Sequence, residues 1–170
     1  CLDAGLEMLI ENNVTVSEAI QVFGNNPFLM ADPEEIISIF KDLPTGCKLL
    51  LDVAHLNVSS RSLEFDKHTA VNELKDLVGG VHLSENDGIT DTNCRIKDDS
   101  WFFGCDFGAA DFATVEVYGQ TADELFGQIQ QKNRLMLIDI INTLYESNNK
   151  IANEVISACL NQIEILGQYY

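Results

Sequence analysis

The chain has 170 residues, of which 46% are hydrophobic, and its 27 acidic and 10 basic residues give a formal net charge of −17. This length and apolar content suit one domain or part of a larger one. The excess of carboxylates disfavours binding to a nucleic-acid backbone, whose affinity for proteins comes largely from Lys and Arg. No apolar run approaches the roughly 18 residues that a membrane-spanning helix needs.

The number of cysteines and the composition of the first residues indicate the cellular compartment in which the protein is expected to fold. Five cysteines without a CxxC pair form an odd set, which favours neither a disulfide framework nor a thiolate zinc site. The first residues lack the basic start of a secretion signal. A reducing compartment fits both features, so we expect a cytoplasmic protein. Because the sequence has no initiator Met and soon enters an apolar segment, we also expect the chain to be cut from a longer one.

Strand and helix patterns alternate along the chain. We predict a strand at 6–10, helices at 17–23 and 32–43, a strand at 48–53, a helix at 66–77 and a strand at 78–83. Residues 84–113, rich in Asn, Asp and Gly, form a long connection that is expected to be functional or mobile. A strand at 113–117 follows, and then helices at 121–133, 135–147 and 150–166. Asp32 with Pro33, and Thr121 with Glu124, are helix-start signals.

This order predicts an α/β fold with a parallel sheet. Four βα units are half of an eight-unit barrel and cannot close one. Three arrangements therefore stay open: the other half lies upstream in a longer protein, the four strands make an open sheet, or two copies of the chain pair.

The predicted strands end on side chains that can bind a metal or transfer a proton. Glu11, Asp52, His82 and Glu116 each follow a short apolar segment. Buried parallel strands end at one face, where such groups meet. Uncompensated charges beside apolar strands are costly, and one shared divalent cation would offset them. Three carboxylates and an imidazole suit Mn²⁺, Mg²⁺, Co²⁺ or Zn²⁺. His55, three residues after Asp52, is a candidate donor to a substrate oxygen.

Two motifs carry a resemblance to a known family. Leu-Leu-Leu-Asp-Val-Ala-His-Leu-Asn at 49–57 and Val-His-Leu-Ser-Glu-Asn-Asp-Gly at 81–88 resemble second-half signatures of the xylose-isomerase-like barrels. That superfamily contains sugar phosphate isomerases and epimerases as well as the endonuclease IV nucleases. Ile-Glu-Asn-Asn at 10–13 is similar to its strand-five region, and Val-Glu-Val at 115–117 to its strand-eight glutamate.

The resemblance implies a fold and an activity. Residues 1–134 would be the C-terminal half of a (β/α)₈ TIM barrel, strands five to eight, and residues 135–170 a helical extension packed on it. Glu11, Asp52, His82 and Glu116 would hold one divalent metal ion. Glu11 and Glu116 would abstract and return a carbon-bound proton of a sugar or sugar phosphate through an enediolate. An N-terminal half-barrel would be required. Apart from the resemblance, the apolar residues of the helix at 135–147 would either pack in the core, which we favour, or form a homodimer face.

The sequence also departs from the family pattern. The nucleases carry Asp-x-His for a further zinc, whereas this chain has Asp91-Thr92-Asn93. Gly88 stands where many epimerases have an arginine, which leaves Arg95 as the candidate substitute for substrate binding. The usual glycine-rich stretch is replaced at 96–100. The alternatives to an isomerase are therefore a metal-dependent phosphodiesterase of the endonuclease IV type and a non-catalytic descendant that binds a sugar-like ligand or a partner protein.

Overall fold

The computed structural model describes residues 5–119 together with Thr121, Glu124 and Gly127. The chain divides after Gly119 into two units, and the fold below is that of the first. The expected boundary at 134, the helices at 135–147 and 150–166 and most of the helix at 121–133 lie outside the described residues. The start signal of that last helix is confirmed, because the amide of Glu124 donates to Thr121 Oγ1 over 3.3 Å and the amide of Thr121 donates to Glu124 Oε2 over 2.8 Å.

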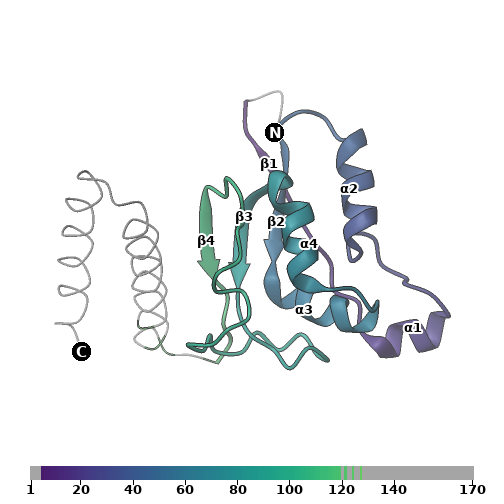
Figure 1. Cartoon of the computed structure of the whole chain (residues 1–170), viewed down its shortest axis with the longest axis vertical. Helices are drawn as coiled ribbons and strands as arrows, with labels where there is room; N and C mark the ends of the chain where they lie inside the picture. Colours follow the sequence, from purple (N-terminus) through teal and green to yellow (C-terminus); the bar gives the residue numbers. More distant parts are fainter. Residues whose placement is uncertain (1–4, 120, 122–123, 125–126, 128–170) are drawn as a thin grey trace, which may run out of the picture. The chain divides into compact units, whose positions relative to one another are not determined.

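Four strands form one parallel sheet in the order β1-β2-β3-β4 (Figure 1). The strands are β1 (Met8–Glu11), β2 (Cys47–Asp52), β3 (Val78–Leu83) and β4 (Phe112–Val115). Each strand therefore pairs with its sequence neighbours, and β1 and β4 are the edges of the described sheet. The predicted parallel α/β fold is confirmed, and its strand order is compatible with half of a barrel.

Helices connect the first three strands. They are α1 (Ser17–Phe23), α2 (Pro33–Asp42), α3 (Val53–Ser62) and α4 (Lys67–Leu74), with the 3₁₀ turn η2 (Lys75–Leu77) before β3. Asp32 caps α2 by accepting from the amide of Glu35, and Asp66 caps α4 by accepting from that of Thr69. None of the helices in residues 5–119 has the length and apolar composition that crossing a bilayer needs.

Helix α3 was not predicted, because its sequence is a poor helix former. Three serines, Asn57 and two β-branched valines occupy its ten residues, and these residue types have modest helix propensity. Two tertiary features stabilise it. Asp52 accepts hydrogen bonds from the amides of Ala54 and His55 at its start, and six of its ten residues are buried.

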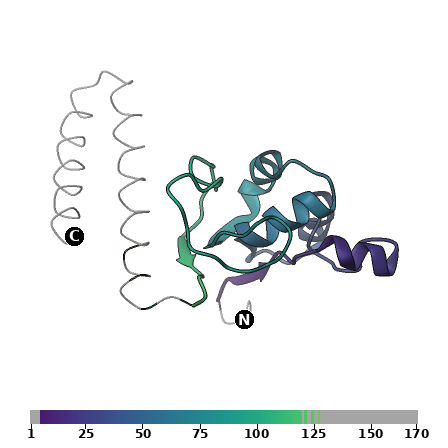
Figure 2. The same cartoon turned by 90° about the horizontal axis from the view of Figure 1, so that it is seen from below.

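The helices cover one face of the sheet. Leu49 and Leu51 of β2 are fully buried and belong to one core with Leu56 of α3 and with Val71 and Leu74 of α4. Figure 2 shows the blue and teal helices to one side of the sheet, with the purple helix α1 projecting from its end. Side chains alternate between faces along a strand, so Asp52 lies on the opposite face from Leu49 and Leu51.

Two glycines shape the face that the helices leave uncovered. A Cβ atom on Gly80 would lie 2.6 Å from the ring of Phe112, and one on Gly79 would lie 2.7 Å from Cδ of Lys48. The bare backbone of β3 therefore allows the side chains of its two neighbouring strands to lie across it. Phe112 keeps 46% of its surface exposed on this face.

The connection between β3 and β4 is a folded loop. Glu85 and Cys94 form an antiparallel bridge within it, and Phe102 is 1% exposed in the core. Gly108 has a φ of +63°, and Asp106 pairs with Lys75 over 3.0 Å. These contacts hold the second half of the loop against the end of α4 and set the position at which β4 begins.

Replacing Gly108 by Ala should lower the free energy of unfolding by about 3 kcal/mol, because the new Cβ would meet the backbone carbonyl of Lys75 in a left-handed conformation. Gly104→Ala is the matched control, since Gly104 has a φ of +85° and no atom within 4 Å of the added Cβ. It should cost only about 1 kcal/mol. Urea denaturation measures both, and equal losses would contradict the tight contact with Lys75.

Candidate metal centre

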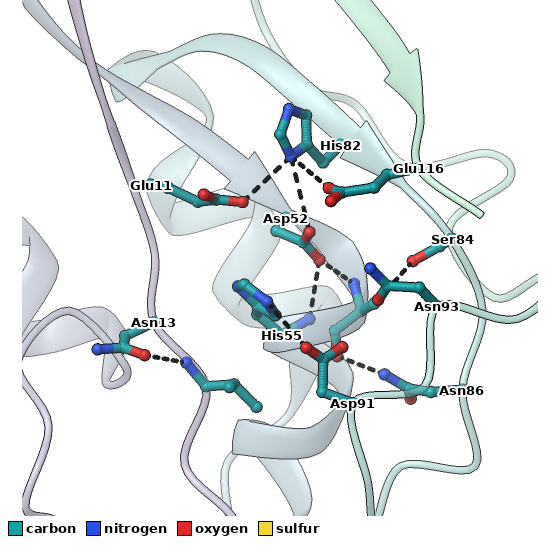
Figure 3. Close-up of polar contacts among 12 residues, drawn as sticks. Glu11, Asn13, Asp52, His55, His82, Ser84, Asn86, Asp91, Asn93 and Glu116 are labelled. Carbon is teal, nitrogen blue, oxygen red and sulfur yellow. Dashed lines mark hydrogen bonds and ion pairs between the residues drawn. The ribbon is translucent and has the colours of Figure 1, made fainter. Parts of the chain in front are cut away.

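Four side chains from the four strands meet at the carboxyl end of the sheet (Figure 3). Asp52 ends β2 and pairs in register with His82 of β3, while Glu11 ends β1 opposite Leu50. Glu116 directly follows β4, two residues after the register partner of His82. All four lie on the face away from the helices, because residues two apart on a strand point to the same side.

His82 stands at the centre of three carboxylates. Its Nδ1 lies 2.9 Å from Oε2 of Glu116, 3.1 Å from Oε1 of Glu11 and 3.8 Å from Oδ2 of Asp52. One ring nitrogen carries at most one hydrogen, so it cannot satisfy three acceptors. One potential metal-ligand atom from each of the four residues lies within 4.8 Å of the others. Ligands about 2.1 Å from a shared ion span at most about 4.2 Å, so small adjustments would bring all four to one cation.

The carboxylate of Asp52 is divided between two roles. Oδ1 caps α3, at 2.7 Å from the amide of Ala54 and 2.9 Å from that of His55. Oδ2 is buried and has no hydrogen-bond partner among the described residues, and Asp52 is only 1% exposed. Burial raises the pKa of Asp52, although the positive charge of His55 opposes the rise. A cation bound among Asp52 Oδ2 and the side chains of Glu11, His82 and Glu116 would satisfy this buried oxygen.

Asn12 fixes the position of Asp52. Its Oδ1 accepts from the amide of Asp52 over 2.6 Å, and its Nδ2 donates to the Asp52 carbonyl over 3.1 Å. The side chain is 2% exposed. It therefore joins the end of β1 to the end of β2 at the point where two of the four donor residues lie. Sequence reasoning noted Asn12 only as part of a motif and missed this role.

His55 lies beside this group and uses both ring nitrogens on the protein. Nδ1 is 2.8 Å from the carbonyl oxygen of Asn12, and Nε2 is 3.2 Å from Oδ2 of Asp91. A carbonyl and an ionised carboxylate only accept, so these two contacts favour an imidazolium, in which both ring nitrogens donate. Burial lowers the pKa of His55, but the charge of Asp52, the Asn12 carbonyl and Asp91 outweigh it, and the pKa is raised.

The β3–β4 loop supplies the outer wall of the site. Asp91 reaches His55 from this loop, and buried Asn93 accepts from Ser84 Oγ over 3.4 Å. Tyr118 donates to Oε1 of Glu116 over 3.3 Å. The negative charge of Glu116 is the main reason why the pKa of Tyr118 is raised. The carboxylates of the centre thus perturb groups beyond it.

The structure brings together five of the six residues singled out from the sequence. Glu11, Asp52, His82 and Glu116 form the cluster, and His55 adjoins it. Arg95 does not join them: it is exposed in the loop after Cys94, and no hydrogen bond or ion pair among the described residues links it to the cluster. The sequence singled out Asp91 only as the aspartate of a segment that departs from the nuclease motif at Asn93, and the fold makes Asp91 the partner of His55.

The donor set fits a divalent cation. One imidazole and three carboxylates form a hard to borderline set that suits Mn²⁺, Mg²⁺, Co²⁺ or Zn²⁺ better than a soft metal. Among the described residues, this cluster is the group of three or more His, Cys, Asp or Glu side chains that lie close enough together to hold a metal ion. The structure therefore supports a site that could hold a metal ion. The preference for a particular ion follows only from the chemistry of its ligand atoms.

No protein-family model, curated protein or solved structure matches this chain. The geometry of the cluster and the motifs in the sequence are therefore the basis for the functional argument.

Replacing Asn12 by Ala should remove both hydrogen bonds to the Asp52 backbone and leave two buried groups unpaired. We expect the free energy of unfolding to fall by about 2–3 kcal/mol and Mn²⁺ affinity to fall roughly tenfold. Asn13→Ala is the control, because the side chain of Asn13 is exposed and accepts only from the next amide, over 2.9 Å. Unchanged Mn²⁺ binding in the Asn12 variant, measured by calorimetry, would show that Asn12 does not position the centre.

Proposed function

We propose that this protein is a divalent-metal-dependent isomerase or epimerase that acts on a sugar or sugar phosphate by proton transfer. The observation that carries the proposal is the buried, unpartnered Oδ2 of Asp52, which faces Glu11, His82 and Glu116 at the carboxyl end of a parallel sheet. Catalytic groups of α/β barrels gather at this end of their strands. The resemblance of the motifs around Asp52 and His82 to the xylose-isomerase-like barrels supports the same reading.

The proposal includes a barrel context. Strands in sequential order, with helices on one face only, are typical of a singly wound barrel, whereas a doubly wound sheet reverses its strand order. The two edge strands and the partly exposed Phe112 on the other face would be covered if four further βα units closed the barrel. An N-terminal half-barrel would then complete the pocket walls that select the substrate.

The residues of the site would divide the chemistry. Glu11 and Glu116 are 40% and 33% exposed at their side chains, so substrate can reach them. One of them would remove a proton from a carbon next to a carbonyl, and the other would return it to the neighbouring carbon or to the opposite face. His55 holds positive charge beside the site and would orient an anionic oxygen. A bound divalent cation would stabilise negative charge that develops on the substrate oxygens.

The nuclease alternative has less support. A further metal would need the loop residues Asp91 and Asn93, yet Asp91 is engaged by His55 and Asn93 offers an amide. A net charge of −17 also opposes binding to a phosphate backbone. Metal stoichiometry separates the candidates, because the isomerase needs one ion, the nuclease two or three, and a binding module none.

Calorimetric titration with Mn²⁺ should show about one ion bound per chain. Asp52→Asn should weaken Mn²⁺ binding at least about 100-fold, because loss of a residue that only supports a ligand already costs about 10-fold to 100-fold in metal affinity. The expected loss follows from removing the charge of Asp52, which is the buried carboxylate of the cluster. Asp98→Asn, which removes an exposed loop carboxylate, is the matched control and should bind like the parent. If both variants bind Mn²⁺ equally, the cluster is not the metal centre.

Glu116→Gln should abolish carbon–hydrogen exchange with solvent while leaving metal binding measurable. The assay incubates the metal-loaded chain in deuterated water with a panel of aldoses, ketoses and their phosphates, and follows deuterium by NMR. Loss of a general base typically costs about 100-fold to 10,000-fold in rate. Glu73→Gln, an exposed change on α4, is the control. Exchange that survives in the Glu116 variant would remove this residue from the mechanism.

A further inference from the structure

A second polar pocket lies on the outer side of α3. Its volume is about 470 Å³, within the range of about 300–1,000 Å³ for small-molecule sites. We call it the Trp101 pocket. It is lined by Asn57, Ser60, Arg61, Lys67, Glu85, Asn86, Asp87, Gly88, Lys97, Asp99 and Trp101.

The Trp101 pocket is separate from the metal centre. None of its lining residues belongs to the four-residue cluster. Asp52 caps the start of α3, whereas Asn57 and Arg61 lie five and nine residues further along the chain. At about 1.5 Å per residue, these positions are roughly 7 Å and 13 Å along the helix from the cap. A ligand in this pocket would therefore occupy its own site.

The pocket gathers basic side chains in a chain that has few of them. The whole sequence has only 10 basic residues against 27 acidic ones. Lys48 and Lys75 form ion pairs with carboxylates elsewhere in the fold. Arg61, Lys67 and Lys97 line the pocket, and no carboxylate among the described residues lies within ion-pair distance of any of them.

Lys67 is held in place by the pocket wall. Its Nζ donates to Oδ1 of Asn57 over 2.6 Å and lies 4.5 Å from the centre of the Trp101 ring. Lys67 is half-buried, and this burial lowers its pKa, although the negative charges of Glu85 and Asp66 oppose the shift. The electrostatic attraction between a half-buried ammonium and an anion is stronger than that between a fully exposed ammonium and the same anion. The ammonium has three hydrogens, so others remain for a ligand.

Some carboxylate oxygens of the pocket already accept hydrogen bonds from the protein backbone. Oδ1 of Asp87 accepts from the amides of Ile89 and Thr90, over 2.8 and 2.9 Å. Glu85 is only 9% exposed. Asp87 and Asp99 are both exposed carboxylates of the lining. The lining thus combines three cations with three carboxylates, and the acidic groups can accept from hydroxyl groups on the same ligand.

We propose that the Trp101 pocket binds the phosphate group of a small hydroxylated organic phosphate. Arg61 and Lys97 would contact the phosphate oxygens, together with the pre-positioned Lys67, because a guanidinium and ammonium groups form charge-assisted hydrogen bonds with phosphate. The volume of the pocket exceeds that of a phosphate ion and leaves room for the organic part.

The wall of the pocket connects it to the β3–β4 loop. Asn57 donates to Oδ1 of Asn86 over 2.7 Å, and Asn86 donates to the carbonyl of Ala54 over 2.8 Å. The amide of Gly88 also donates to Asn86. A ligand that bridges Arg61 and Lys97 would therefore hold this loop against α3, and the same loop supplies Asp91 to His55.

The test uses the single tryptophan of the chain, Trp101, as a fluorescence reporter in the pocket. Glycerol phosphate, inorganic phosphate and glycerol are titrated into the full 170-residue chain with EDTA present, so that the result does not depend on the metal centre or on the proposed isomerase activity. We expect saturable binding of glycerol phosphate, weaker binding of inorganic phosphate and no binding of glycerol. A rise of the thermal midpoint with glycerol phosphate, at matched ionic strength, is the second readout.

Three variants sharpen the test. Arg61→Ala should raise the Kd for glycerol phosphate about tenfold, the effect of one charge-assisted contact. Asp99→Asn should lower the Kd, because it removes a negative charge beside the anion. Lys41→Ala, an exposed basic residue at the end of α2, should leave the Kd unchanged. The proposal is overturned if neither readout responds to glycerol phosphate, if inorganic phosphate binds as tightly, or if the Arg61 and Lys41 variants behave alike.

Discussion

The buried carboxylate of Asp52 is the constraint on which the rest of the structure depends. One oxygen starts α3 by accepting hydrogen bonds from two backbone amides, and the other accepts no hydrogen bond from the residues that the structure describes. A buried charge that is only half satisfied costs stability unless a cation meets it. The fold thus uses one side chain both to begin a helix of weak intrinsic propensity and to offer a ligand atom, so the position of the helix and the position of the metal centre are fixed together.

The charges around Asp52 are arranged in layers. Glu11 and Glu116 stand at the ends of the edge strands and are open to solvent, while His82 lies between them on a central strand. Behind this group, His55 carries a positive charge that is held by Asp91 and by a backbone carbonyl. The site therefore combines a buried carboxylate that is fixed by backbone hydrogen bonds with two carboxylates that a small molecule can reach.

Helix α3 relates the two candidate sites. Its first turn adjoins the metal centre, and its second half forms a wall of the Trp101 pocket. The β3–β4 loop contacts both regions, through Asp91 at one and through Asn86 at the other. Although this loop has no long helix, its hydrogen bonds to α3 and the burial of Phe102 give it defined anchors. The expectation that this long connection is functional or mobile stays a prediction.

The sequence by itself determined the parallel α/β order and the four donor residues, because apolar runs ending on Glu, Asp or His are local patterns that parallel pairing must bring to one edge. The helix at 17–23 and the strand at 78–83 were located to the residue. Only the tertiary structure decided that residues 53–62 form a helix, since burial and the Asp52 cap outweigh a weak local propensity. It also decided the roles of Asn12 and Asp91 and the gathering of basic side chains around Trp101. Those contacts join residues far apart in the chain, and no spacing in the sequence encodes them.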